Sequence, residues 1–361
     1  MSSNLTRARS VMRRLFSPEP HAALASLQAE VRRLSKHVEQ LKEAQRNTVE
    51  QLKEAQRSAL EQVRSVGTTA TQLKLVSVLN RRHQQEIEAL PTLLNESRIA
   101  EHVRRAVGGA SLIADPYEHI VVEGVLPDDV YDLLIRAIPP VEFFDNRERF
   151  KQDLTFPMEY GPTLSAAVWG FMDDVVARRI VRPAVLEKFH DPLQNHFASM
   201  FGAAFVAQAN ALPQSASGGR LMRRRPGYHL KPHRDPKRAV LTCLMYLARA
   251  GDSETYGTQV FRVLDDAEAD YKQTYYPEED GRKCELVKVV PFTPNTMLVS
   301  LNSRGAHGAT IPQDAPADLE RYTYQFYVAP LNEALSAFVK SLPGDRRANW
   351  RSKELVRPEY A

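Results

Sequence analysis

The N-terminal part of the chain carries hydrophobic residues at the spacing of a helix seam. They are separated by four and three residues in turn, which is the heptad pattern of a left-handed coiled coil, and they are Leu27, Val31, Leu34, Val38 and Leu41. Residues 21–66 contain neither glycine nor proline and are rich in strong helix formers. The pattern therefore predicts one long helix over 21–66, which we expect to end at Gly67.

Beyond Val38 the hydrophobic repeat lengthens to 11 residues. The segment VEQLKEAQR, which begins at Val38, is repeated 11 residues later, beginning at Val49. A repeat of this length straightens a supercoil or reverses its hand. Because a lone helix would leave this stripe in water, we expect a homo-oligomer that assembles through residues 21–66. A single helix folded back on the rest of the chain is the alternative.

After a second helical stretch over 72–107, the pattern changes near residue 115 to short β-branched runs between proline, glycine and aspartate clusters. Helical spacing returns only over 126–138 and 164–205. The clearest strands are predicted at 239–247, 258–263, 285–290, 296–301 and 321–328. Such a pattern is typical of an α+β fold with a β core and helices packed outside it. The last strand alternates cleanly, with Tyr322 and Tyr324 on one face and Arg321 and Thr323 on the other.

Composition and charge exclude several classes of protein. The chain has 361 residues, of which 43% are hydrophobic and 25% charged, so a fibrous or disordered protein is excluded. Residues 1–66 carry a net charge of +5 and the remainder −1, which disfavours nucleic-acid binding by the main domain. No apolar run is long enough to cross a membrane. Cys243 and Cys284 are too few for a disulfide framework and are interpreted as buried, reduced thiols.

These features predict a cytoplasmic protein. The first 18 residues are basic and weakly amphipathic, and they form either a frayed terminus or a segment that targets an organelle or contacts an anionic membrane surface.

Two separated segments supply candidate metal ligands. His233 and Asp235 form an H-x-D pair whose side chains share one side of an extended backbone. Taken alone, the pair is more simply a surface loop, but His307 follows an apolar strand further along the chain. Two histidines and one aspartate make the facial triad of non-haem Fe(II) oxygenases. Arg321, with Thr323 on the same strand face, matches the distal carboxylate of a dicarboxylic cosubstrate.

In this order, the motifs over residues 220–328 resemble those of the prolyl-4-hydroxylase-like branch of the Fe(II)/2-oxoglutarate dioxygenases. The resemblance implies a double-stranded β-helix, or jelly roll. It implies that His233, Asp235 and His307 bind iron, that Arg321 binds the 2-oxoglutarate tail, and that Tyr246 hydrogen-bonds the same carboxylate. The implied reaction hydroxylates an organic substrate with O₂ and releases succinate and CO₂, with ascorbate as an accessory reductant.

The chain departs from the family pattern at Arg225, which stands where the family often has tyrosine, and in the length of the interval from His307 to Arg321. We expect substrate specificity in two features, the charge run Arg223-Arg224-Arg225, interpreted as a solvated strand edge, and the acidic, tyrosine-rich stretch 264–284, interpreted as a lid or a disordered loop. The substrate stays open among a prolyl residue, a small molecule, a lipid and a sugar.

The domains are expected to be a basic arm, a coiled coil, a helical connector, a dioxygenase domain and a C-terminal tail, at 1–20, 21–66, 67–110, 111–335 and 336–361. Two other functions compete with the oxygenase. One is a non-enzymatic coiled-coil scaffold with a ligand-binding jelly-roll domain, and the other is a different metal enzyme, such as a cupin-like isomerase or a Mn/Zn hydrolase.

Overall fold

The computed structural model of the chain describes residues 18–145, 148–156, 158, 161–266 and 274–347. The basic arm over 1–17, the centre of the acidic stretch at 267–273 and the last residues, 348–361, lie outside the described residues. The chain divides by its contacts into two units, Met1–Ala70 and Thr71–Ala361, and each is described by itself. Among the described helices, none is both long and apolar enough to cross a bilayer.

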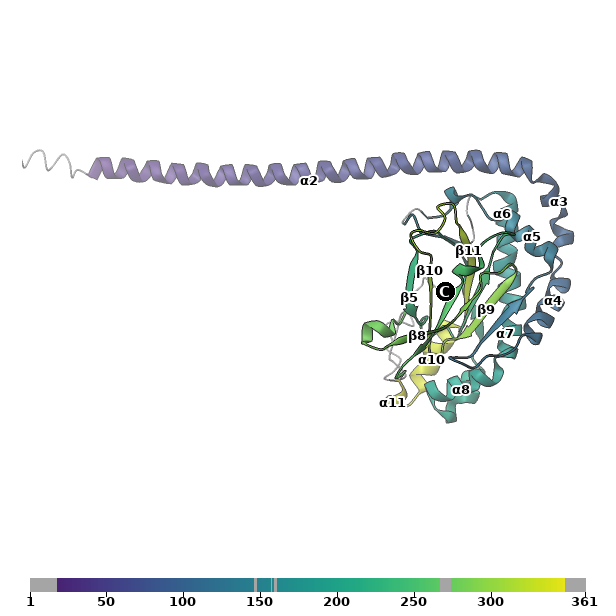
Figure 1. The fold of residues 1–361 in the computed structure, drawn as a ribbon. Coiled ribbons are helices and arrows are strands. Elements are labelled where there is room, and N and C mark those ends of the chain that lie inside the picture. Colours follow the sequence, from purple (N-terminus) through teal and green to yellow (C-terminus); the bar gives the residue numbers. More distant parts are fainter. Residues whose placement is uncertain (1–17, 146–147, 157, 159–160, 267–273, 348–361) are drawn as a thin grey trace, which may run out of the picture. The chain divides into compact units, whose positions relative to one another are not determined.

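The N-terminal helix α2 spans Pro18–Arg82 (Figure 1). The predicted helix over 21–66 is confirmed, but the predicted end at Gly67 is wrong, because α2 continues through Gly67, Thr68 and Thr69. A glycine inside a helix costs only about 1 kcal/mol relative to alanine. The helical hydrogen bonds of the turns on either side outweigh that cost.

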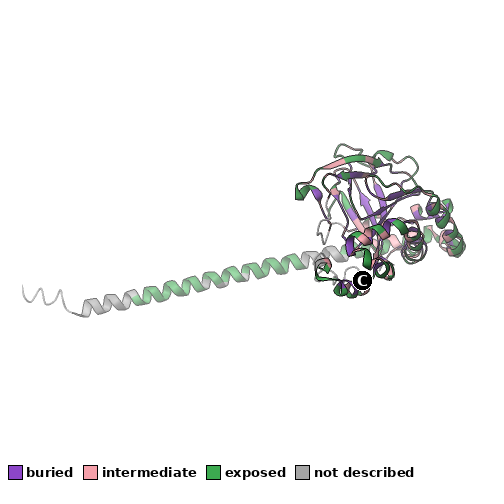
Figure 2. Ribbon diagram, turned by 90° about the horizontal axis from the view of Figure 1, so that it is seen from below, coloured by how far each residue is buried: buried purple, intermediate pink, exposed green. Residues whose placement is uncertain are grey.

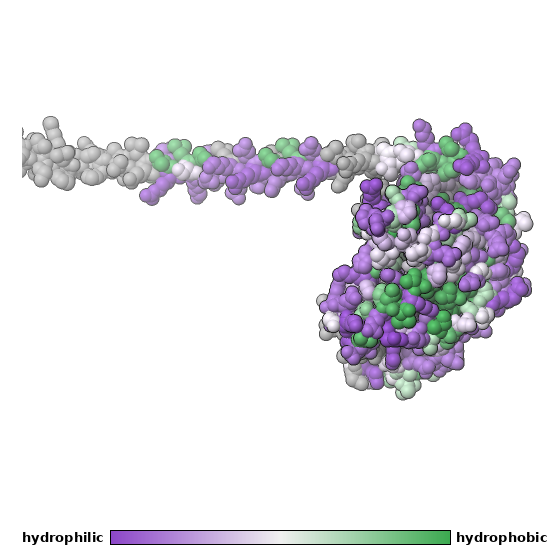
Figure 3. Space-filling model, viewed as in Figure 1, coloured by the Kyte–Doolittle hydropathy of each residue, from purple (hydrophilic) through white to green (hydrophobic). Residues whose placement is uncertain are grey.

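The hydrophobic seam of α2 is exposed in the first unit (Figure 2). Its described members have between 44% and 64% of their surface accessible, and they are Val31, Leu34, Val38, Val49 and Leu52. Figure 3 shows apolar side chains interrupting the polar surface of this helix. The seam thus lies where a partner helix would cover it, and self-association stays a prediction.

The second unit is built on two antiparallel sheets. The larger has the order β1-β9-β6-β11-β4-β2, with β3 also paired to β11. Its strands are β1 His119–Glu123, β2 Lys151–Thr155, β3 Gln214–Ala216, β4 Arg220–Arg224, β6 Leu241–Tyr246, β9 Thr296–Leu301 and β11 Arg321–Pro330. The smaller has the order β5-β10-β7-β8, from strands β5 His229–His233, β7 Thr258–Val263, β8 Cys284–Val290 and β10 Ala306–Thr310.

From β4 onward, consecutive strands alternate between the sheets except at the β7–β8 hairpin, which lies within the smaller one. The two sheets face each other, since Arg321 of β11 lies 3.4 Å from Thr258 of β7 and Tyr327 of β11 bonds to Asp235 just after β5. This is a jelly-roll core. The predicted α+β class is confirmed.

Helices cover the outer face of the larger sheet (Figure 1). The α-helices after α2 are α3 Gln84–Leu93, α4 Glu96–Gly109, α5 Asp128–Arg136, α6 Thr163–Phe171, α7 Arg182–Lys188, α8 His190–Phe201, α9 Val206–Asn210, α10 Asn332–Ser341 and α11 Gly344–Arg347. A π-helix, η2 Met172–Val181, joins α6 to α7. The shorter 3₁₀ turns are η1 Val141–Phe143, η3 Ala203–Phe205, η4 Glu254–Tyr256 and η5 Pro277–Asp280.

Helix α4 illustrates how the sequence sets this packing. The side chain of Asn95 accepts a hydrogen bond from the backbone N–H of Arg98 at 3.0 Å and so caps the first turn. Ile99, Val103 and Val107 then recur every four residues on one face, and all three are buried in the core. The amphipathic pattern therefore fixes which face of α4 packs inward.

Strand β11 divides the interior into two environments. As the alternation predicts, Tyr322, Tyr324 and Phe326 point to the helices and belong to the large hydrophobic core. The intervening Arg321 and Thr323 point to the smaller sheet. The space between the two sheets therefore receives the polar side chains, and the candidate site lies there.

Two further details concern the C-terminal side of the β domain and its cysteines. Helix α10 crosses the proposed boundary at residue 335, and its Phe338 and Val339 are buried in the core, so the chain stays folded well into the expected tail. Cys243 is buried as expected, whereas Cys284 at the start of β8 is only half-buried; both are free thiols.

Candidate active site

The pairing of β5 with β10 brings two histidines together. These strands are antiparallel, and their register places His233 directly opposite His307. Side chains of directly opposed residues lie on the same face of a sheet, and the two imidazole rings are 4.3 Å apart between centroids. Asp235 follows His233 by two residues, which returns its carboxylate to the same side.

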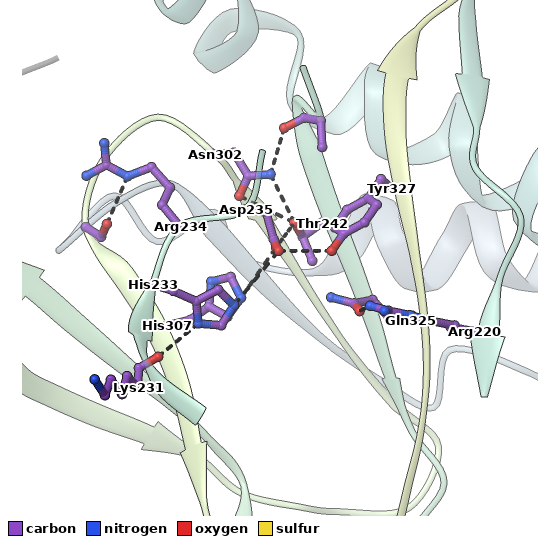
Figure 4. Close-up of polar contacts among 12 residues, drawn as sticks. Arg220, Lys231, His233, Arg234, Asp235, Thr242, Asn302, His307, Gln325 and Tyr327 are labelled. Atoms are coloured by element: carbon purple, nitrogen blue, oxygen red, sulfur yellow. Dashed lines mark hydrogen bonds and ion pairs between the residues drawn. The ribbon is translucent and has the colours of Figure 1, made fainter. Parts of the chain in front are cut away.

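The three side chains meet at one point between the sheets (Figure 4). One donor atom from each lies within 4.8 Å of the other two. His233 Nε2 is 3.9 Å from Asp235 Oδ1, and His307 Nε2 is 3.4 Å from Asp235 Oδ2. Metal–ligand bonds near 2 Å place neighbouring donors about 3 Å apart, so a small inward adjustment would let the three side chains hold one ion.

A local hydrogen bond orients His233 for metal binding. His233 Nδ1 lies 3.0 Å from the carbonyl oxygen of Lys231. A proton on Nδ1 donated to that carbonyl leaves Nε2 with its lone pair toward the cluster, which is the usual outer support of a metal-binding imidazole. Burial, followed by the charge of His233, lowers the pKa of His307 to about 4. The ring of His307 is thereby favoured in the neutral state that binds metals.

The carboxylate of Asp235 is held on both oxygens. The Thr242 hydroxyl donates to Oδ2 at 2.6 Å, and the Tyr327 hydroxyl donates to Oδ1 at 3.0 Å. Asn302 Nδ2 in turn donates to Thr242 Oγ1 at 3.0 Å. Burial alone would raise the pKa of Asp235, but the nearby His307 and these hydrogen bonds lower it below its usual value. Asp235 is therefore an oriented anion.

The far end of the inter-sheet space contains a buried cation. Arg321, the first residue of β11, is only 4% exposed, and no described carboxylate lies within ion-pair distance of it. Its guanidinium lies over the rings of Tyr246, at 5.5 Å, and Phe292, at 5.0 Å. Desolvation lowers its pKa from the ordinary value. A buried charge without a counter-charge is costly, so this position is suited to an anionic ligand.

Three buried polar atoms at this end lack hydrogen-bond partners within the described part of the chain. They are Arg321 Nε, Thr323 Oγ1 and the Tyr246 hydroxyl oxygen. The sheet register pairs Thr323 with Tyr246, so the two hydroxyl groups come from neighbouring strands. A guanidinium N–H and two hydroxyl groups can all donate to one carboxylate. The candidate cosubstrate residues Arg321, Thr323 and Tyr246 are thus brought to one place.

Arg321 also lines a cavity of about 250 Å³. Its lining includes three carboxylate side chains, Asp252, Asp318 and Glu320. Acidic residues thus outnumber the two cations of the lining, Arg249 and Arg321, and disfavour a carboxylate, whereas Tyr246 and Thr323 offer hydrogen-bond donors. A carboxylate ligand of Arg321 is therefore better accommodated between the sheets.

The charge run Arg223-Arg224-Arg225 is not the solvated edge that was expected. Arg223 and Arg224 on β4 are 6% and 3% exposed. Arg223 pairs with Glu320, and Arg224 pairs with Asp153 at 2.7 Å. The prediction was wrong because β4 lies inside the larger sheet between β2 and β11, where both residues are covered and neutralised by acidic neighbours. They belong to the scaffold.

A clamp between the two candidate ligands was not predicted. The guanidinium of Arg234 contacts both carboxylate oxygens of Asp266, at 2.8 and 2.7 Å, and donates to the carbonyl oxygen of Gly305 at 3.0 Å. The backbone of Arg234 also exchanges two hydrogen bonds with Tyr275. Asp266 and Tyr275, which lie on either side of 267–273, are thus both hydrogen-bonded to Arg234.

This clamp places part of the stretch 264–284 beside the cluster. The ring of Tyr276 lies 5.8 Å from that of His233, between centroids. The described residues of this stretch therefore lie beside the cluster, and its role as a lid stays a prediction.

Several residues of the site carried no motif. Thr242 and Asn302 were assigned no role from the sequence. Thr242 bonds to Asp235 and Asn302 bonds to Thr242, and these contacts depend on the pairing of β6 with β9. Tyr327 could have been found, because the alternation of the last strand places it on the face of Arg321. The exposed His229 bonds to Thr310 and takes no part in the cluster.

Comparison with known proteins gives structural matches alone. No family model matches the chain, and no curated protein matches its sequence. A 2OG-Fe(II) oxygenase-family oxidoreductase from Burkholderia pseudomallei is similar with a TM-score of 0.35 and 9% identity, over 65% of this chain and 90% of that one. A prolyl-4-hydroxylase from Pseudomonas putida has a TM-score of 0.35 and 16% identity, over 64% and 98%.

HygX from Streptomyces hygroscopicus, solved with nickel and 2-oxoglutarate bound, has a TM-score of 0.33 and 12% identity, over 59% of this chain and 82% of that one. At these scores and identities, the function has to be derived from the residues of the site.

Proposed function

We propose that the chain is an Fe(II)- and 2-oxoglutarate-dependent oxygenase with a double-stranded β-helix core. The observation that carries the proposal is the pairing of two features in one inter-sheet space. A three-ligand cluster of two histidines and one aspartate lies at one end, and a buried Arg321 with no ion-pair partner in the described part of the chain lies at the other. A facial triad leaves coordination positions for a bidentate cosubstrate and O₂.

The residues fit both absent groups. His233, Asp235 and His307 would hold the iron, since two neutral imidazoles and one carboxylate suit Fe(II). Arg321 and Thr323, with Tyr246, would hold the distal carboxylate of 2-oxoglutarate, because Arg321 Nε and the two hydroxyl groups have no partner among the described residues. When bound, the iron and the 2-oxo acid supply the oxidising chemistry, with succinate and CO₂ as products.

The chain's own residues contribute position and electrostatics. Thr242 and Tyr327 hold the carboxylate of Asp235 in place before metal arrives. Arg321 neutralises and orients the cosubstrate, which fixes how far its other end reaches toward the cluster. Because Asp235 supplies the third ligand, we propose hydroxylation of an organic substrate rather than halogenation, which in related enzymes goes with a small residue at this position.

The function is tested by anaerobic addition of Fe(II) and then 2-oxoglutarate to the full-length protein. We expect a visible metal-to-ligand charge-transfer band that needs both additions and is absent when Zn(II) replaces Fe(II). A Mn/Zn hydrolase or a ligand-binding scaffold would give no such band, and its absence would reject the proposal. A screen of peptides and metabolites for stimulated succinate release would then address the substrate.

We also propose that residues 21–66 form a coiled coil that joins copies of the chain. Fully burying a leucine or valine is worth about 1.5–3 kcal/mol, and the seam exposes several of them. Deletion of residues 1–66 is expected to reduce the mass measured by light scattering to that of a monomer.

Point variants test the seam itself. Replacing the exposed seam residues Leu34 and Leu52 with serine should reproduce the effect of the deletion, while Gln51→Ser, next to the seam, should leave the mass unchanged. If the truncated chain keeps the full-length oligomeric number, the assembly lies elsewhere.

A further inference from the structure

A tyrosine outside every motif also has an unpaired hydroxyl group between the sheets. Tyr117, two residues before β1, is 2% exposed. It belongs to a small hydrophobic cluster shared with Tyr246, Val260, Phe292 and Leu298. Its hydroxyl oxygen is buried and has no hydrogen-bond partner among the residues that the structure describes. It shares this property with Tyr246 of the candidate cosubstrate site.

Two other buried tyrosines of the second unit have partners for their hydroxyl groups. The Tyr131 hydroxyl donates to the carbonyl oxygen of Ala248 at 2.6 Å, and the Tyr324 hydroxyl donates to Asp173 at 2.8 Å. Leaving a buried hydroxyl unpaired costs about 1–3 kcal/mol. A phenylalanine at position 117 would fill the same space without that cost. A ligand that accepts a hydrogen bond from the Tyr117 hydroxyl group would offset it.

The surroundings of Tyr117 place it at the metal-binding end of the space. Gly305 lies in the turn between β9 and β10, just before His307, and a Cβ atom on it would collide with the ring of Tyr117. Burial, then the neighbouring Tyr246 and Asp235, raises the pKa of Tyr117. Tyr246 in turn feels the charge of Arg321. Tyr117 therefore packs beside the turn that precedes His307 and in one cluster with Tyr246, whose ring lies under the guanidinium of Arg321.

We propose that the Tyr117 hydroxyl group donates a hydrogen bond to the 2-oxo acid end of the bound cosubstrate, while Arg321 and Thr323 hold its distal carboxylate. This inference rests on the proposed function and extends it by one binding residue. A ligand held at both ends enters the cluster in one orientation, which favours productive chelation over other modes.

The test compares Tyr117→Phe with the wild-type protein and with Tyr324→Phe, which removes a buried hydroxyl that faces the helices. The Fe(II)-loaded proteins are titrated anaerobically with 2-oxoglutarate and with pyruvate, which keeps the 2-oxo acid end and lacks the distal carboxylate. A hydrogen bond to a charged group is worth about 1.5–3 kcal/mol. We expect Tyr117→Phe to raise the Kd of both ligands by about 10- to 100-fold and to leave Fe(II) affinity unchanged.

The thermal midpoint of the ligand-free protein provides a readout that does not involve binding. Tyr117→Phe should be at least as stable as the wild type, because it removes an unpaired hydroxyl group, whereas Tyr324→Phe should be less stable. A destabilised Tyr117→Phe would overturn the inference, since the hydroxyl group would then already have a partner.

Three binding outcomes separate this inference from the proposed function. An unchanged Kd for both ligands, or a raised Kd for 2-oxoglutarate alone, overturns the role of Tyr117 at the 2-oxo acid end and leaves the oxygenase assignment intact. Failure of the wild-type protein to bind 2-oxoglutarate overturns both.

Discussion

Replacement of Arg321 with methionine is expected to weaken 2-oxoglutarate binding by at least about 100-fold, because two charge-assisted hydrogen bonds of about 1.5–3 kcal/mol each are lost. The same change should stabilise the ligand-free protein. Arg321 is buried without an ion-pair partner within the described residues, and replacing a buried charge by an apolar side chain of similar volume is often stabilising by about 1–4 kcal/mol. Anaerobic titration and thermal unfolding measure the two effects.

Arg224→Met is the matched control. Arg224 is as buried as Arg321 but is paired with Asp153 at 2.7 Å, so its loss leaves an uncompensated carboxylate and should lower the thermal midpoint. It should leave 2-oxoglutarate affinity within a few-fold of the wild type, provided that the variant folds. If Arg321→Met binds 2-oxoglutarate normally, the distal carboxylate is held by other residues and the assignment of this end of the site fails.

His233→Ala is expected to abolish the charge-transfer band and the release of succinate. Removing an outer partner of a metal ligand already costs about 10- to 100-fold in metal affinity, and this change removes a ligand itself, leaving Asp235 and His307. Equilibrium dialysis with Fe(II) under anaerobic conditions measures the affinity directly. We expect a loss of more than about 100-fold.

His229→Ala controls for the loss of an imidazole from the same strand. His229 is four residues earlier on β5, is exposed, and bonds to Thr310. Its replacement should leave both the metal affinity and the band unchanged. Retention of the band in His233→Ala would show that the metal is bound elsewhere.

The parts of the fold that depend on periodicity were predictable. The helix over 21–66 and the alternation of β11 follow from local patterns, and both appear as expected. Short strands such as β2 and β3 were missed because their five and three residues are too few to show a period. The inward position of Arg223 and Arg224 follows from the neighbours of β4 in the sheet, which only the tertiary fold defines.

The candidate site divides in the same way. His233, Asp235, His307 and Arg321 have chemistry and spacing that the sequence displays. Tyr117 and Thr242 do not, since a tyrosine or threonine near a strand is common and its role comes from what the fold places beside it. Sequence therefore identifies the groups that react or bind ions, and the structure identifies those that orient them.

The direct opposition of His233 and His307 across β5 and β10 ties metal binding to correct assembly. A slip of one residue between these strands would turn one imidazole to the opposite face. The carboxylate between them is hydrogen-bonded by Thr242 and Tyr327, which belong to the facing sheet. An ion held by all three ligands would therefore stabilise one register and one apposition of the sheets. Metal binding would therefore favour the correctly paired fold, in addition to its role in the reaction.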